Sequence, residues 1–366
     1  MLRKFFMACI AISSFFVNNA QQASAPVTDS TAAAEEEQKP VFSFTGSADV
    51  YYRYDFAKTK ANNFTSFTNS HNSFALGMAS LKAEHKSDKV GAVIDLGFGQ
   101  RAKEFSYNDE GISAAIKQLY VSYSPMDWLK FTAGTWATHV GYELLDPQLN
   151  RNYSMSYLFT NGPFSHTGLK ADITKGKHGV MAGISNATDF RMPPDGQVNK
   201  KFIIGQYSFA ASDNVKIYLN YVGGKGPDTS KTNQFDAVAT AKLSDKFNIG
   251  FNASVNNTQF WDGAKNLDGQ SWWGSAVYLS VDPQSWFGLT LRGEYFNDDN
   301  QLKMFSTAPT GGNIFATTLS ANFKVNSFII IPEFRMDNAS QSIFIDKDGA
   351  AKKSFSSILV AAVYSF

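Results

Sequence analysis

Hydrophobic and polar residues alternate along most of the chain. Between positions 41 and 56, the even positions hold Phe, Gly, Ala, Val or Tyr, and the odd positions hold mostly Ser, Thr, Asp or Arg. A period of two residues indicates a β-strand with one apolar and one polar face. This segment is far longer than the usual strand of about 5–6 residues, and roughly 9–11 residues suffice to cross the hydrocarbon of a bilayer.

The same alternation recurs in segments up to the end of the chain. In the segment 246–256, one face carries Phe247, Ile249 and Phe251, and the other is polar throughout, with Asn, Ser and Gly after Lys246. An antiparallel sandwich also alternates, but its strands are usually half as long. Further segments of this kind span residues 89–101, 233–243, 286–296 and 354–366.

The connections between these segments alternate between short and long. Seven short turns, such as Ser87-Asp88-Lys89 and Lys175-Gly176-Lys177, are separated by eight long polar stretches. Short periplasmic turns and long external loops are typical of outer-membrane barrels. We therefore predict an all-β fold, a closed antiparallel transmembrane β-barrel of about 16 strands, with both ends of the barrel chain on the periplasmic side. The long stretches lie near 57–72, 102–111, 141–163, 187–199, 223–232, 256–270, 297–313 and 338–353.

The first forty residues have a different composition. A basic start, an apolar run from Phe5 to Val17 and small residues up to Ala20 or Ala25 form a secretory signal pattern. We predict a signal peptide at 1–25, a disordered acidic linker at 26–40 and an outer-membrane β-barrel at 41–366. The lone cysteine, Cys9, lies in the signal region, which excludes a disulfide framework and a cysteine metal site.

Aromatic residues are abundant and charges are scarce. The chain is 14% aromatic and 18% charged, with 33 Lys+Arg against 32 Asp+Glu. This balance gives no support to nucleic acid as a partner. Trp128, Trp286 and Phe328 flank short turns, whereas Trp136, Trp272 and Trp273 lie toward long loops, so we assign them to two interfacial girdles. Pro332 lies inside a strand and predicts a β-bulge, or a short strand that ends before it.

Charged residues on the polar faces are expected to line a water-filled lumen. A charge that faces lipid at the midplane costs roughly 2–4 kcal/mol, so mid-strand charges favour the inward face. Those near strand ends could instead extend to the headgroups. The set mixes both signs and favours neither anions nor cations: Asp49, Arg53, Asp95, Lys117, Lys130, Lys216, Asp236, Arg292, Glu294, Glu333 and Arg335.

The third long stretch, 141–163, is the longest and is unusually apolar, with Leu, Met, Tyr and Phe throughout. Folding into the lumen would bury this surface and narrow the pore. Glu143, Asp146 and Arg151 would then be constriction charges that face basic residues of the wall. The alternatives are a loop folded over the rim or a contact with a neighbouring protomer.

Two motifs carry a resemblance to a known family. The run Asn152-Tyr153-Ser154 with Phe159, Pro163-Phe164 and His166-Thr167-Gly168, together with Gly141-Tyr142-Glu143, resembles the OmpL-like β-barrel porin family, which is common in Bacteroidetes. The resemblance implies a Gram-negative outer-membrane porin of unassigned substrate. Met155 departs from it, because a basic residue is expected there. The terminal strand, with Tyr364 and the final Phe366, resembles the membrane-insertion signal read by the barrel-assembly machinery.

These observations predict a porin for passive diffusion of small hydrophilic solutes. The expected partners are outer-membrane lipid, those solutes, the barrel-assembly machinery and a possible second copy of the chain. An alternative is a barrel-anchored adhesin or secretion-machinery scaffold with a blocked lumen. A transporter for hydrophobic compounds and a soluble secreted sandwich or propeller rank lower. We expect no enzyme, cofactor or metal, because no HExxH, GxSxG or Walker-type run occurs and neighbouring Ser165 and His166 point to opposite faces.

Overall fold

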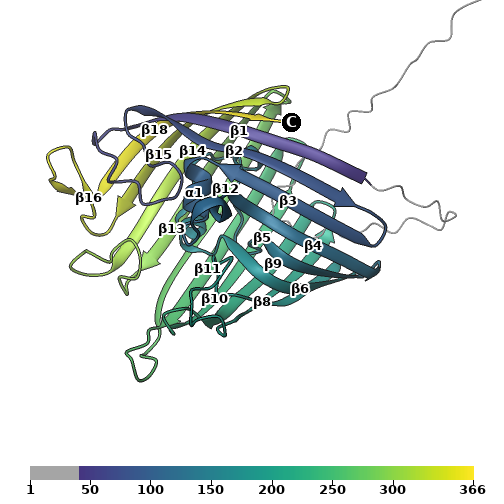
Figure 1. The fold of residues 1–366 in the computed structure, drawn as a ribbon. Coiled ribbons are helices and arrows are strands. Elements are labelled where there is room, and N and C mark those ends of the chain that lie inside the picture. Colours follow the sequence, from purple (N-terminus) through teal and green to yellow (C-terminus); the bar gives the residue numbers. More distant parts are fainter. Residues whose placement is uncertain (1–40) are drawn as a thin grey trace, which may run out of the picture.

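The alternating segments form the sixteen strands of a closed antiparallel β-barrel in the computed structural model, which describes residues 41–366 (Figure 1). Each strand pairs with its neighbours along the chain, and β1 closes the ring against β18. This confirms the predicted fold class. The predicted signal peptide, 1–25, and acidic linker, 26–40, lie outside the described residues.

The strands average well over ten residues. The barrel comprises β1 (Val41–Asp55), β2 (Ser73–Lys86), β3 (Val90–Phe98), β4 (Ile116–Met126), β5 (Leu129–Ala137), β6 (Ser165–Lys175), β7 (His178–Ser185), β8 (Phe202–Ser212), β9 (Val215–Lys225), β10 (Lys231–Lys242), β11 (Phe247–Gln259), β12 (Gln270–Gln284), β13 (Phe287–Asp298), β14 (Gly312–Val325), β15 (Phe328–Ala339) and β18 (Ser354–Ser365).

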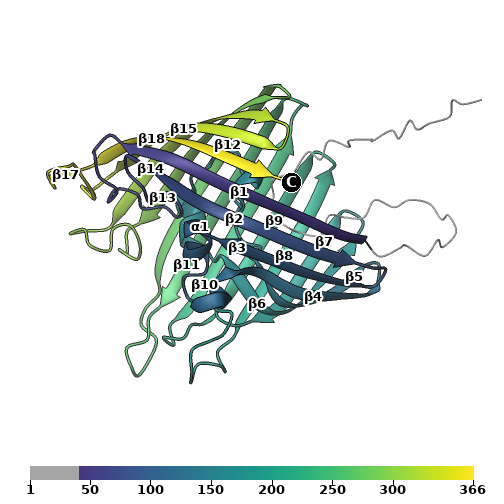
Figure 2. The same ribbon diagram turned by 45° about the horizontal axis from the view of Figure 1, so that its top comes forward.

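Short turns and longer loops alternate at the two ends of the barrel. The long loops carry the helices α1 (Gln100–Phe105) and α2 (Tyr157–Asn161), the 3-10 turns η1 (Gly111–Ala115) and η2 (Pro147–Leu149), and the hairpin β16 (Phe344–Ile345) and β17 (Ala351–Lys352). Neither described α-helix has the length of a membrane-crossing helix. β1 begins and β18 ends at the short-turn end, where Gly46 and Phe366 exchange two backbone hydrogen bonds of 3.0 and 2.9 Å (Figure 2).

The two faces of each strand differ as the alternation predicts. On β13, Leu291 is 39% exposed on the outside, whereas Arg292 on the inside is 0% exposed. The outer face of the ring is therefore apolar and suits lipid, and the inner face carries the polar and charged side chains. Tyr364 and Phe366 belong to this exposed outer set.

Two predictions about individual residues are wrong. β15 continues through Pro332 in unchanged register with β18, without a bulge. The pairs between β15 and β14 are interrupted there, so the strand tolerates a residue without an N–H by losing bonds on one side only. Trp136 and Trp272 are buried inside the barrel and do not belong to an outer girdle, whereas Trp273 is 45% exposed.

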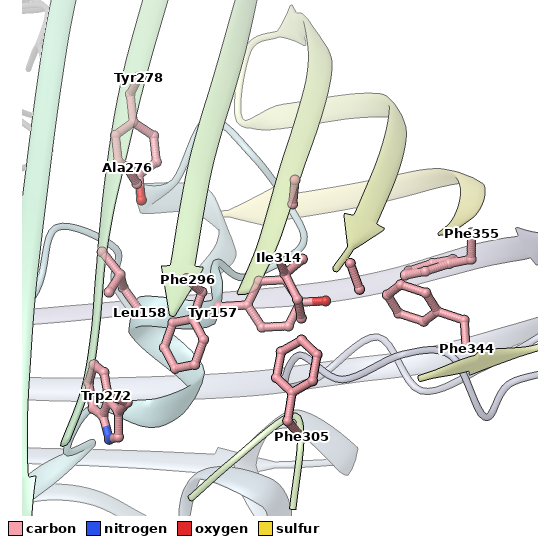
Figure 3. Packing of buried hydrophobic residues seen from close by; sticks show 12 residues of the cluster. Tyr157, Leu158, Trp272, Ala276, Tyr278, Phe296, Phe305, Ile314, Phe344 and Phe355 are labelled. Atoms are coloured by element: carbon pink, nitrogen blue, oxygen red, sulfur yellow. The ribbon is translucent and has the colours of Figure 1, made fainter. Parts of the chain in front are cut away.

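Apolar side chains form a buried cluster inside the barrel toward the long loops. Figure 3 shows Tyr157 and Leu158 of α2 beside aromatic and aliphatic residues of the wall. Phe305 and Phe344 of the external loops complete this cluster. The wall thus supplies both apolar and polar partners to a segment that enters the barrel.

Candidate functional site

The connection between β5 and β6, residues 138–164, crosses the lumen and is called loop 3 below. Two short-range devices shape it. The Asn150 side chain accepts from the Leu144 N–H at 2.9 Å and donates to the Leu144 carbonyl at 2.5 Å, which closes a turn. The Ser156 hydroxyl accepts from the Phe159 N–H at 3.1 Å and caps α2. The remaining polar groups need partners from the wall.

Arg292 of β13 holds the centre of loop 3. Its Nη1 lies 2.5 Å from Glu143 Oε1 and donates to the Ser154 carbonyl at 2.7 Å. The other Glu143 oxygen accepts from the Ser156 N–H at 2.7 Å. The fully buried Arg292 guanidinium therefore binds loop 3 at Glu143 and at Ser154, and Glu143 in turn binds Ser156.

A second buried group of charges lies beside the first, on β13 and β15. Glu294 accepts from the Tyr157 N–H at 2.7 Å, and Asp337 accepts from the Tyr157 hydroxyl at 2.6 Å. Arg335 bridges these two carboxylates, at 3.3 Å from Glu294 and 2.8 Å from Asp337. Arg335 also donates to the Met155 carbonyl at 2.7 Å. Each charge in this group is therefore both paired and bound to the loop.

Glu333 of β15 and Asp49 of β1 bind the next part of the loop. Glu333 accepts from the N–H groups of Tyr153 and Ser154 at 2.8 and 3.2 Å. The Tyr153 hydroxyl donates to Asp49 at 2.5 Å. A Cβ at Gly77 would lie 1.7 Å from the Asp49 carboxylate and 2.8 Å from the Tyr153 hydroxyl. Glycine is thus required there for the close approach of loop and wall.

Lys117 of β4 connects the loop to the opposite wall. It lies 2.5 Å from Asp146 and 3.1 Å from Asp95 of β3. The β3–β4 register shifts between Asp95 and Leu96, so Lys117 is an extra residue of a bulge and points inward together with Gln118.

Of the charged residues of loop 3, Arg151 contacts the wall nearest to the short turns. It forms two bonds of 2.9 and 2.6 Å with Asp282 of β12. Glu143 and Asp146 therefore lie against basic wall residues, as the sequence predicts, whereas Arg151 lies against an acidic one.

The other predicted lumen residues divide into two groups. Asp236 accepts from the Gly141 N–H of loop 3 at 3.0 Å, and Arg53 pairs with Asp55 at 3.2 Å. Lys130 and Lys216 have no carboxylate within 4 Å among residues 41–366. They lie one residue from the short-turn ends of β5 and β9.

Several partners of loop 3 were missed by the sequence analysis. Asp337 follows the same alternation as Glu333 and Arg335, so that pattern could have found it. Asp282 lies next to Pro283, where the sequence indicates a turn, although it belongs to β12. The alternating segment 89–101 predicts a strand that ends at Arg101, but β3 ends at Phe98 and Arg101 lies in α1, where it donates to the Leu145 and Tyr153 carbonyls at 3.1 and 3.3 Å. Met155 is buried, and its side chain packs with Phe67 and Phe159.

Burial keeps the side chains of Tyr142 and His139 in loop 3 neutral at pH 7. It raises the pKa of Tyr142 to about 12 and lowers the pKa of His139 to about 4. Outside loop 3, burial also raises the pKa of Asp189 to about 6, and this carboxylate accepts from the Phe164 N–H at 2.7 Å. The charge of loop 3 at pH 7 therefore comes from Glu143, Asp146 and Arg151.

Cavities lie on both sides of loop 3. One of about 590 Å³, near the long loops, is bordered by Thr160–Phe164 of loop 3, by Gln234 and Asn256 of the wall, and by Tyr107 and Lys303 of other external loops. A second, of about 420 Å³, lies at the short-turn end and is bordered by Glu84, Lys86, Tyr120, Lys130 and Asp172. The lumen is thus occupied in its middle and hollow toward both ends.

Comparisons with known proteins agree with this architecture. The model of the family described as "Putative beta-barrel porin-2, OmpL-like" matches residues 41–366. No curated protein sequence matches the chain.

Solved outer-membrane proteins have a similar fold at low sequence identity. The anion-selective porin from Comamonas acidovorans is 9% identical, with a TM-score of 0.61 over 90% of this chain and 100% of that one. The outer membrane channel DcaP of Acinetobacter baumannii is 11% identical, with a TM-score of 0.59 over 92% and 100%. The in-vitro folded trimer form of OmpT from Vibrio cholerae is 10% identical, with a TM-score of 0.59 over 89% and 99%.

Proposed function

Because the chain belongs to the OmpL-like family of β-barrel porins and is an integral outer-membrane barrel, we propose that it is a passive channel for small hydrophilic solutes. In this proposal, solutes diffuse through a water-filled lumen that loop 3 narrows. A barrel of sixteen strands is wide enough to hold water after its wall side chains are placed.

One observation supports a narrowing role for loop 3. Its charged side chains and many of its backbone groups bind inward-facing residues of β1, β4, β10, β12, β13 and β15. These strands lie around much of the ring, which favours a loop that narrows the lumen over a loop folded above the rim. Glu143, Asp146 and Arg151 would border the narrow part, and solutes would reach it from the cavities on either side.

The remaining expectations complete the proposal. Residues 1–25 would act as a secretory signal in a Gram-negative cell, and the barrel-assembly machinery would insert the barrel from its last strand. Trimer formation by a solved OmpT supports testing for a homo-oligomer. Membership of a porin family favours a channel over an enzyme.

Single-channel recording in a planar bilayer tests this function. We expect the purified mature protein to give stepwise openings whose size grows with salt concentration. Replacing residues 143–156 by a short Gly-Ser linker should enlarge the step. Shortening the exposed external loop 260–269 is the matched control and should leave the step unchanged.

A folded, heat-modifiable barrel that gives no openings, even without loop 3, would contradict the porin function. It would favour the alternative, a barrel-anchored adhesin or scaffold with a blocked lumen. Equal steps with and without loop 3 would retain the channel but remove the narrowing role of the loop.

A further inference from the structure

The inward-facing charges between loop 3 and the short turns differ in kind from those that hold loop 3. On each strand, we consider the inward residues between the short turn and the first contact with loop 3, and we call this region the lower lumen. Its acidic residues are Glu84 and Asp172. Its basic residues are Lys82, Lys86, Lys130, Lys170, Lys216, Lys242 and Lys324. The formal charge of the lower lumen is therefore plus five.

The few acidic groups of the lower lumen are already paired. Lys82 lies 3.1 Å from Glu84, and Lys170 lies 3.5 Å from Asp172. Two further lysines have carboxylate partners outside the lower lumen: Lys242 lies 2.8 Å from Asp245 in the adjoining turn, and Lys324 lies 3.9 Å from Asp282, the partner of Arg151. Lys86, Lys130 and Lys216 have no carboxylate within 4 Å in the described part of the chain.

The remaining acidic groups of the wall are unable to offset this charge. Asp49, Glu294, Glu333 and Asp337 accept hydrogen bonds from loop 3, and Asp236 is bound by Gly141. The side chains of all five are buried. Acidic and basic residues are nearly equal in number over the whole sequence. These five acidic residues, however, accept hydrogen bonds from loop 3 and do not neutralise the lysines of the lower lumen.

We infer that the pore favours small anions over cations, with the lower lumen as the selecting region; this inference rests on the proposed channel function. A cleft lined by charges of one sign focuses the potential and raises the local concentration of counter-ions. Rings of Lys and Arg act in this way in anion pores. Lys86 and Lys130 border the cavity of about 420 Å³ at the short-turn end, but Glu84, Asp88, Asp127 and Asp172 border it too, so the preference rests on the unpaired lysines and not on the summed charge around this cavity.

Neighbouring lysines strengthen the preference. In the pairing of β5 with β6, Lys170 lies opposite Thr132, so Lys130 is its diagonal neighbour, and Asp172 lies directly opposite Lys130. Lys216 has the same relation to Lys242, because Lys216 lies opposite Thr240. Diagonal side chains are about 7–8 Å apart, a separation at which like charges repel and an anion between them relieves the repulsion.

The reversal potential in a KCl gradient across a planar bilayer tests this inference. We expect chloride to permeate the wild-type pore more readily than potassium, with a preference that weakens at high salt as charges are screened. The triple variant K86E/K130E/K216E changes the formal charge of the lower lumen from plus five to minus one. The sign of the reversal potential should therefore invert.

A matched control separates lumen charge from total charge. The variant K60E/K265E/K353E makes the same change in net charge at exposed residues of the external loops and should keep the wild-type sign. Heat-modifiability on gels establishes that each barrel is folded, and a neutral triple variant with Gln should reduce the preference without inverting it.

The possible outcomes test anion selectivity and the proposed channel function separately. A conducting wild-type pore that prefers potassium, or that has no preference, would overturn the anion inference and leave the channel intact. Equal shifts in the lumen and control variants would also overturn it. A folded wild-type barrel without conductance would overturn the channel function and the anion inference together.

Discussion

The middle of the lumen and the lower lumen use charge in opposite ways. In the middle, the carboxylates and guanidiniums around loop 3 are buried and hydrogen-bonded to the loop, and Arg292, Arg335, Glu143 and Glu294 are also ion-paired. In the lower lumen, Lys86, Lys130 and Lys216 are at least partly exposed and have no acidic partner among the described residues. Paired buried charges fix a structure, whereas unpaired exposed charges act on mobile ions. The position of a residue relative to loop 3 therefore decides which role its charge has.

Among the substitutions that test this difference, Arg292→Met should have the largest effect on the stability of the barrel and on its conductance. It leaves Glu143 without its guanidinium partner and the Ser154 carbonyl without a donor, and Glu294 keeps only Arg335 as a cationic partner. Breaking a buried ion pair on one side costs about 3–5 kcal/mol. We expect the urea midpoint of the barrel in liposomes to fall accordingly, with larger and noisier conductance steps as loop 3 loosens.

An unchanged midpoint and unchanged steps for Arg292→Met would show that the buried network does not hold the loop. The double variant E143Q/R292M is a further test. It removes both charges of the closest ion pair, so Glu143 is no longer left as a buried charge without a partner. This double variant should recover part of the loss.

An intermediate effect should come from Gly77→Ala. The new Cβ has no room beside Asp49 and the Tyr153 hydroxyl, so the hydrogen bond between them must break or the loop must shift. Overpacking of this kind costs typically 1–3 kcal/mol. We expect a lower urea midpoint and faster protease cleavage within loop 3.

Gly293→Ala is the matched control for Gly77→Ala. Gly293 is also a strand residue, but a Cβ there meets no atom within 4 Å. It should leave the midpoint and the cleavage rate at wild-type values. Equal effects of the two substitutions would attribute the loss to strand propensity and not to contact with the loop.

The smallest effect should come from Arg151→Ala, at the boundary between the two regions. The side chains of Arg151 and Asp282 are 24% and 18% exposed, so water screens their attraction. Exposed pairs contribute about 0.2–1 kcal/mol. We expect a small shift of the urea midpoint, and a loss as large as that of Arg292→Met would remove the distinction between buried and boundary pairs.

The ring of strands could be predicted from the sequence because alternation is a local signal. The inward position of Glu333 and Arg335 follows from their spacing along one strand. The roles of these charges could not be predicted, because their partners Tyr153 and Met155 lie in loop 3, far away along the chain. Pro332 and Trp272 were misread because local preferences took no account of a continuous ladder or of an aromatic cluster inside the barrel.

The pairing of β1 with β18 joins the two ends of the described chain. Ser47 meets Ser365 only after every intervening strand has been synthesised, so ring closure has the longest sequence separation of any pairing in the barrel. Until then, β1 and β15 present unpaired N–H and C=O groups, which are templates for adding foreign strands. A chain truncated before Ser354 would therefore be an aggregation hazard as well as an open sheet.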